Sequence, residues 1–127
     1  MHVDVAQFRA MRQSLRAAIP ARRQRGPWRR LVAELLRLAG PGAEFLKHAE
    51  RPWWSATFTG ARHRVVIAFH GDAAVACGEA YIAALPDHDF AIRGQLVADT
   101  TITAVEHGVI PCPRMVVEAE FLLLEDA

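Results

Sequence analysis

The chain has 127 residues, of which 52% are hydrophobic and 23% are charged, a composition typical of one soluble globular domain. No apolar run approaches the ~18 residues of a membrane-spanning helix, and the N-terminal residues lack the apolar core of a signal peptide. These features predict a cytoplasmic protein without a membrane partner. The two cysteines fit no metal-ligand spacing, and we expect them to be reduced thiols.

The net charge of +1 is divided unevenly along the sequence. Residues 1–51 hold eleven Lys/Arg and four Asp/Glu, whereas residues 52–127 hold four and ten. This division indicates either that the two halves dock on each other, within one chain or across a dimer, or that an oppositely charged partner binds. We expect a single domain over 1–127, with a basic helical segment at 1–51 and an acidic ββαββ segment at 52–127.

The first third of the chain has helical periodicity. A helix is predicted over 5–19, because apolar residues recur there at steps of three and four. A second helix is predicted over 27–39, with proline at its first position and glycine past its end and with Glu34 on its solvent side. A third, short helix is predicted over 41–49.

Two strands are predicted next, over 53–59 and 62–69, and the Gly-Ala pair between them fits a two-residue type II′ turn. In this register the alternation of both strands agrees on one apolar face, which includes Trp54 and Phe58. Trp53 then lies on the opposite face, where a tryptophan is either a candidate interface or ligand-stacking residue or is covered by the third predicted helix.

The segment from Asp72 to Leu85 is predicted to be the central helix, with Asp72 as its N-cap and Pro86 beyond its end. Between the cap and the proline, Glu79 is the only charged residue. A helix that is apolar nearly all round is expected to be buried on most of its surface. We therefore place it on the apolar face of the sheet.

Two further strands are predicted over 90–105 and 115–124, with a turn at 107–108 that places Gly94 opposite Phe121. The expected fold is α+β. An N-terminal helical segment precedes a ββαββ unit, which forms a four-stranded, mostly antiparallel sheet with one buried helix on a face.

The outer face of this sheet is predicted to be more apolar than a fully solvated face requires. Such a face favours a homodimer, or another homo-oligomer, that assembles through the sheet or its edge. The interface candidates are Trp53, Val97, Val116, Leu122 and Leu124.

Polar residues gather at both ends of the central helix. If the connection from the second strand to the third is a right-handed parallel crossover, the turn after the helix returns to the start of the second strand. Two histidines and two carboxylates would meet there in a candidate ligand or metal site, although Asp in such a turn also supports the turn itself. The candidates are His63, Asp87, His88 and Asp89.

A basic arm lies before and at the start of the second helix. Arginines interleaved with an aromatic residue can contact phosphates and stack on bases, but solvated arginines around a packed Trp28 are the simpler interpretation. Nucleic acid is therefore not the expected partner. The arm comprises Arg22, Arg23, Arg25, Arg29 and Arg30.

Catalytic and cofactor motifs are absent from the sequence, which has no P-loop, GxGxxG, GxSxG or HExxH. The leading hypothesis is a small, non-enzymatic protein-interaction or assembly module, a homo-oligomer or a subunit of a larger complex, without a cofactor. One alternative is a small-ligand-binding protein or enzyme with a pocket between the central helix and the sheet, near His63 and residues 87–89. A second alternative is nucleic-acid binding through the basic arm.

Overall fold

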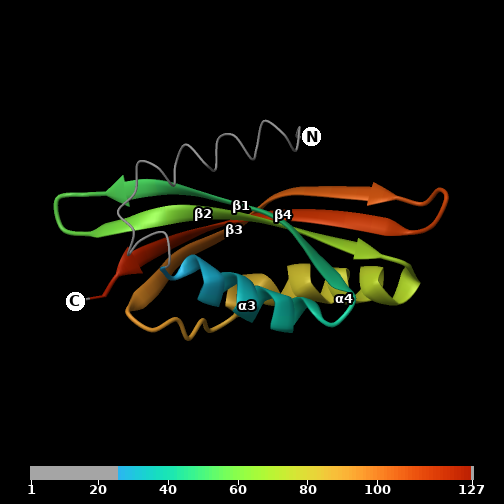
Figure 1. The fold of residues 1–127 in the computed structure, drawn as a ribbon, viewed down its shortest axis with the longest axis horizontal. Coiled ribbons are helices and arrows are strands. Elements are labelled where there is room, and N and C mark those ends of the chain that lie inside the picture. The colour runs from blue at the N-terminus through green and yellow to red at the C-terminus, as the bar shows by residue number, and fades with distance from the viewer. Residues whose placement is uncertain (1–25, 127) are drawn as a thin grey trace.

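The computed structural model describes residues 26–126, which form two α-helices and four long strands (Figure 1). The predicted helix over 5–19 lies outside the described residues. The α-helices are α3 (Trp28–Ala39) and α4 (Asp72–Ala84), and α4 continues into a 3-10 helix, η1 (Leu85–Asp87). The strands are β1 (Ala43–Trp54), β2 (Thr59–His70), β3 (Gln95–Gly108) and β4 (Arg114–Glu125).

The four strands form one sheet in the order β1-β2-β4-β3, in which all neighbouring strands are antiparallel. Strands β2 and β3 therefore run parallel, with β4 between them, and α4 lies in the crossover that connects them. Both helices cover the same face of the sheet (Figure 1), α3 beneath β1 and α4 beneath β2 and β4. This arrangement confirms the predicted α+β fold, a helix followed by a ββαββ unit. Within residues 26–126, neither helix has the length and hydropathy needed to cross a bilayer.

The core lies between the sheet and the two helices. Alternate residues of β2 and β4 face the helices, as their apolar alternation predicts, and meet the apolar stripe of α3. Burying each large side chain contributes about 1.5–3 kcal/mol. The large apolar side chains that are fully buried are Leu31, Leu35, Val65, Ile67, Phe69, Tyr81, Leu85, Met115, Val117, Phe121 and Leu123.

Helix α4 is less buried than its apolar composition suggests. Its N-cap is Gly71 rather than Asp72, without a side-chain hydrogen bond, and its buried residues are Ala74, Gly78 and Tyr81. At Gly78 a Cβ atom would overlap Met115 and lie 2.9 Å from the Phe69 ring, so the helix approaches the sheet closely there. The prediction that most of its surface is buried is wrong, because the sheet covers one side of α4 and much of the opposite, alanine-rich side is exposed.

The predicted third helix, over 41–49, is wrong because residues 41 and 42 form a turn and residues 43–49 belong to β1. Helix α3 ends at Gly40, which has a positive φ of 94°. Glycine tolerates this conformation, and the chain turns there to enter the sheet. The ββαββ unit thus begins at Ala43 rather than at residue 53.

The predicted turn between β1 and β2 is also wrong. Trp54 pairs with Thr59, and the hydroxyl of Ser55 accepts hydrogen bonds from the N–H groups of Thr57 and Phe58 at 3.3 and 3.0 Å. This turn shifts the register from the predicted one. Trp54 and Phe58 are therefore 73% and 48% exposed instead of lying in the core.

In the second hairpin, Gly108 pairs with Arg114 and residues 109–113 form the loop, so the predicted turn at 107–108 is wrong. Gly94 precedes the strand, and Thr100 lies opposite Phe121. The β3 register shifts twice, between Val97 and Asp99 and between Ile102 and Ala104. An extra residue in a strand exchanges the faces of the residues beyond it. As a result, the predicted alternation of this strand does not hold along its whole length.

Candidate functional site

Two buried histidines lie where β1 pairs with β2. Glu50 of β1 is directly opposite His63 of β2, and His48 lies two residues before Glu50. Because strand residues two apart share a face, these three residues lie on the face that the helices cover. The Nε2 atom of His48 is 2.9 Å from the Nδ1 atom of His63, a hydrogen bond in which one ring nitrogen donates and the other accepts.

Aromatic rings enclose this pair. The ring of Trp28, from α3, stacks on His48 with a centroid distance of 4.7 Å and an interplanar angle of 14°. The rings of His48 and His63 are stacked in turn, with centroids 5.2 Å apart. The two histidines are 3% and 1% exposed. Burial lowers the pKa of His63 to about 4, because the charged imidazolium loses its hydration, so this ring is neutral at pH 7.

We call these residues the His48–Glu50–His63 cluster, and their metal-ligating atoms all lie within 4.8 Å of one another. The Nε2 atom of His63 is buried and has no hydrogen-bond partner within residues 26–126. A cavity of about 30 Å³ adjoins the cluster and is lined by Glu50, His63 and Glu125, among others. It has room for about one water molecule.

His88 lies in a different environment, bonded to α3. Its Nε2 atom is 2.9 Å from Oε1 of Glu34, and the N–H of Ala91 donates to both oxygens of the same carboxylate at 3.2 and 3.3 Å. Glu34 is 9% exposed, so its predicted solvent position is wrong. The segment after η1 lies against this face of α3. The Glu34 carboxylate connects the segment to the helix through its hydrogen bonds to His88 and Ala91.

We expect Glu34→Ala to lower the free energy of unfolding by about 2 kcal/mol, because it leaves the Ala91 N–H and His88 without their shared acceptor. Urea unfolding followed by circular dichroism measures the change. Glu79→Ala, an exposed position on α4, is the matched control and should shift stability by less than about 0.5 kcal/mol. Equal losses in both variants would contradict a structural role for Glu34.

The predicted site of His63 and residues 87–89 is therefore divided between two places. His63 joins His48 and Glu50, whereas His88 joins Glu34, and Asp87 and Asp89 are exposed. His48 and Glu50 were not predicted as site residues, because 41–49 was expected to be a helix and Glu50 to follow directly after it. If this segment is taken as a strand, the two-residue spacing of His48 and Glu50 places both side chains on one face. That spacing is the feature of the sequence that could have indicated the cluster.

A hollow of about 350 Å³ lies between the segment after η1 and the start of β3. Its volume falls in the range of small-ligand pockets. Two of the four sequence-based candidates, His88 and Asp89, contribute to its wall. The lining residues are Pro86, His88, Asp89, Phe90 and residues 95–100.

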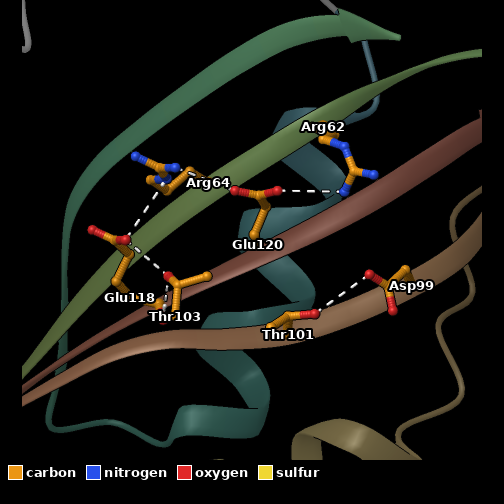
Figure 2. Close-up of polar contacts among 7 residues, drawn as sticks. All are labelled: Arg62, Arg64, Asp99, Thr101, Thr103, Glu118 and Glu120. Atoms are coloured by element: carbon orange, nitrogen blue, oxygen red, sulfur yellow. Dashed lines mark hydrogen bonds and ion pairs between the residues drawn. The ribbon is translucent and has the colours of Figure 1, made fainter. Parts of the chain in front are cut away.

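The outer face of the sheet carries a network of charges (Figure 2). Glu120 pairs with Arg62 at 3.4 Å and with Arg64 at 3.3 Å, and Arg64 also lies 3.7 Å from Glu118. The hydroxyl of Thr103 donates to the Glu118 carboxylate at 2.8 Å. Partly exposed pairs of this kind contribute little stability individually, but they place both signs of charge across the middle of this face.

The predicted interface residues occupy several environments. Leu122 and Leu124 lie on the outer face but are only 8% and 7% exposed, and Val116 is half-buried near the other end of β4. Val97 is opposite the buried Leu123 and packs against the core, so its predicted place on the outer face is wrong; the irregularity after it shifts the register. Trp53 is half-buried opposite Gly60 at the end of β1.

The exposed apolar residues instead include two pairs at the tips of the two hairpins. Trp54 and Phe58, at the β1–β2 tip, are 73% and 48% exposed. Val109 and Ile110, in the β3–β4 loop, are 75% and 89% exposed. The two tips lie at opposite ends of the elongated sheet (Figure 1). Neither pair was predicted from the sequence, because the predicted turns lie elsewhere.

The structure describes two of the five arginines of the basic arm, Arg29 and Arg30. Arg29 and Arg30 are exposed at the start of α3, and the Arg29 guanidinium carbon lies 5.6 Å from the centre of the Trp28 ring. Because Trp28 also stacks on His48, one face of its indole is not accessible to a base. Arg22, Arg23 and Arg25 lie outside the described residues.

No protein-family model matches the sequence, and the search of curated proteins gives no significant match. Among solved structures, the chain is similar to the type 4 fimbrial biogenesis protein PilO from Pseudomonas aeruginosa, with 19% sequence identity and a TM-score of 0.38. The match covers 94% of this chain and 82% of the PilO chain. A likeness this weak carries no argument about function.

Proposed function

We propose that this protein is a non-enzymatic protein-interaction module that assembles with further copies of itself through its β3–β4 hairpin tip. The observation that carries the proposal is the exposure of Val109 and Ile110, which are 75% and 89% accessible. Single exposed apolar residues are ordinary on protein surfaces. Here two large ones are adjacent, and the five-residue loop around them, 109–113, contains no charged residue.

The exposure and apolar composition of this tip support self-association. A two-fold axis brings the same loop from two copies together, so that Val109 and Ile110 of each copy are buried by the other. Each fully buried aliphatic side chain contributes about 1.5–3 kcal/mol, against the loss of translational and rotational freedom on association. A contact limited to one loop is therefore expected to be reversible and concentration-dependent.

The test is the solution mass over a range of protein concentrations, measured by sedimentation velocity. We expect the wild-type mass to rise above that of the 14.1 kDa chain and the double variant Val109→Ser/Ile110→Ser to stay monomeric. Leu96→Ser is the matched control, because Leu96 is also 56% exposed but lies on β3 away from the tip. A monomeric wild type, or equal dissociation of the control, would refute the proposal.

A second candidate function is small-ligand binding in the hollow beside His88, favoured by its volume of about 350 Å³. Native mass spectrometry of the purified protein reports a bound molecule directly. His88→Ala, which removes a lining side chain, should then reduce the bound fraction. Mass equal to that of the bare chain in both proteins would exclude a retained ligand.

A further inference from the structure

The His48–Glu50–His63 cluster has the chemistry of a metal site. Two imidazoles and a carboxylate are the ligand set of catalytic zinc sites and of other divalent transition-metal sites. All three side chains come from β1 and β2, which are directly paired. Because Glu50 pairs with His63, the three residues are held at neighbouring positions along these two strands. We propose that these three residues bind a divalent transition-metal ion, with Zn²⁺ as the preferred occupant.

The distances suit this assignment after a small rearrangement. A tetrahedral zinc ion with bonds of about 2.0–2.1 Å separates its ligand atoms by roughly 3.4 Å. In the cluster the ligating atoms lie within 4.8 Å of one another, and the His48–His63 hydrogen bond is 2.9 Å long. The Nδ1 atom of His63 takes part in that hydrogen bond, which leaves the Nε2 atom as the ligating atom of His63. Binding therefore requires the ligating atoms to approach one another by up to roughly 1.4 Å to reach the tetrahedral separation.

A second observation also points to a ligand at this place. The Nε2 atom of His63 is buried without a hydrogen-bond partner within residues 26–126, a state that is uncommon for buried polar atoms in native proteins. A metal ion bound at this nitrogen gives it the partner that it lacks among the described residues.

The surroundings indicate an open rather than a closed site. Trp28 stacks on His48, so the α3 side of the cluster is closed to water. The cavity of about 30 Å³ lies against Glu50 and His63, with Pro27 also in its lining, and it has room for about one water molecule. Three protein ligands and one water complete a tetrahedral shell. The carboxylate of Glu125, which also lines the cavity, adds a second negative charge near the ion.

The experiment titrates the full-length, chelator-treated protein with Co²⁺, whose visible absorption reports the coordination number, and then with Zn²⁺ as competitor. We expect one equivalent of Co²⁺ to bind with the intense bands of a four-coordinate ion, and Zn²⁺ to displace it. Loss of an outer-sphere partner alone typically weakens metal binding 10- to 100-fold. His48→Gln and Glu50→Gln remove direct ligands and should each weaken binding by at least about tenfold.

His70→Gln is the control, because His70 is an exposed histidine that pairs with Glu44 at 3.0 Å, far along β2 from the cluster. Far-UV circular dichroism confirms that each variant is folded, and Glu50→Gln preserves the shape of the side chain. The proposal is overturned if one-to-one binding is absent, if either ligand variant binds as tightly as the wild type, or if His70→Gln weakens binding equally. None of these outcomes depends on the oligomeric state.

Discussion

Gly60→Ala is expected to lower the free energy of unfolding by about 3 kcal/mol, the upper part of the range for overpacking substitutions. Gly60 lies in β2 opposite Leu124 of β4. A Cβ atom at this position would overlap the carbonyl oxygen of Leu123 and lie 2.9 Å from the Cα atom of Leu124. These are backbone atoms of the paired strand, so no side-chain rotation relieves the overlap, and this end of the β2–β4 ladder must open.

Urea unfolding of the wild type and the variant measures the effect. Gly108→Ala is the matched control, since Gly108 also pairs with β4, opposite Arg114, but a Cβ there meets no atom within 4 Å. We expect the control to change stability by less than about 0.5 kcal/mol. If the two alanine variants unfold at the same urea concentration, the close approach at Gly60 does not exist in solution.

The second large effect is a loss of stability in acid that depends on His63. Burial lowers the pKa of this imidazole from 6.5 to about 4. Between these two values the unfolded chain binds a proton and the folded chain does not, so stability falls as the pH falls through this window. Above pH 6.5 the contribution of His63 is constant. From pH 7.5 to pH 4 the loss amounts to about 3 kcal/mol, because a tenfold difference in proton affinity between the folded and unfolded chains corresponds to about 1.4 kcal/mol.

The measurement compares denaturant unfolding of the chelator-treated wild type with that of His63→Leu at pH 7.5 and pH 4. His48 and Glu50 face His63, and other ionisable groups also contribute to the pH dependence of both proteins. The informative quantity is therefore the difference between the two pH dependences. We expect the variant to lose about 3 kcal/mol less than the wild type over this interval. Parallel losses would mean that His63 is protonated in the folded protein at its ordinary pKa.

Sequence periodicity predicted the parts of this fold in which one apolar face is buried. Helices α3 and α4 and the alternation of β2 and β4 lie where the pattern placed them. The α+β fold class could be predicted from these elements, because two hairpins on either side of a central helix can pack into only a few layered architectures.

The registers of both hairpins were predicted wrongly for local reasons. The inward positions near the end of β1 hold His48 and Glu50, so apolar alternation disappears there and the strand resembles a helix in sequence. In β3, the irregularity after Val97 exchanges the faces, and a fixed period of two cannot reveal it. Turn chemistry was ambiguous as well, since Ser55 supports the observed turn while a glycine five residues later favours another.

The candidate site could be predicted only in part, because the wrongly predicted strand register also assigned the wrong neighbours to His63. His63 was identified from sequence, but its assigned partners, residues 87–89, were the polar groups nearest in the predicted topology. Its observed neighbours come from a strand whose sequence pattern favours a helix. Glu34 was missed because a carboxylate on an amphipathic helix is ordinarily solvated, and its burial depends on a segment more than fifty positions later.

The order of the strands has a consequence for how the chain reaches this structure. Within the β1–β2 hairpin, paired residues are between 5 and 26 positions apart, from Trp54 with Thr59 to Ala43 with Phe69. Across the β2–β4 seam they are between 44 and 64 positions apart, from His70 with Arg114 to Gly60 with Leu124. Closing loops of that length costs chain entropy before any contact offsets it. We therefore expect the β1–β2 contacts to form before the β2–β4 contacts and the joining of β2 and β4 to limit the folding rate.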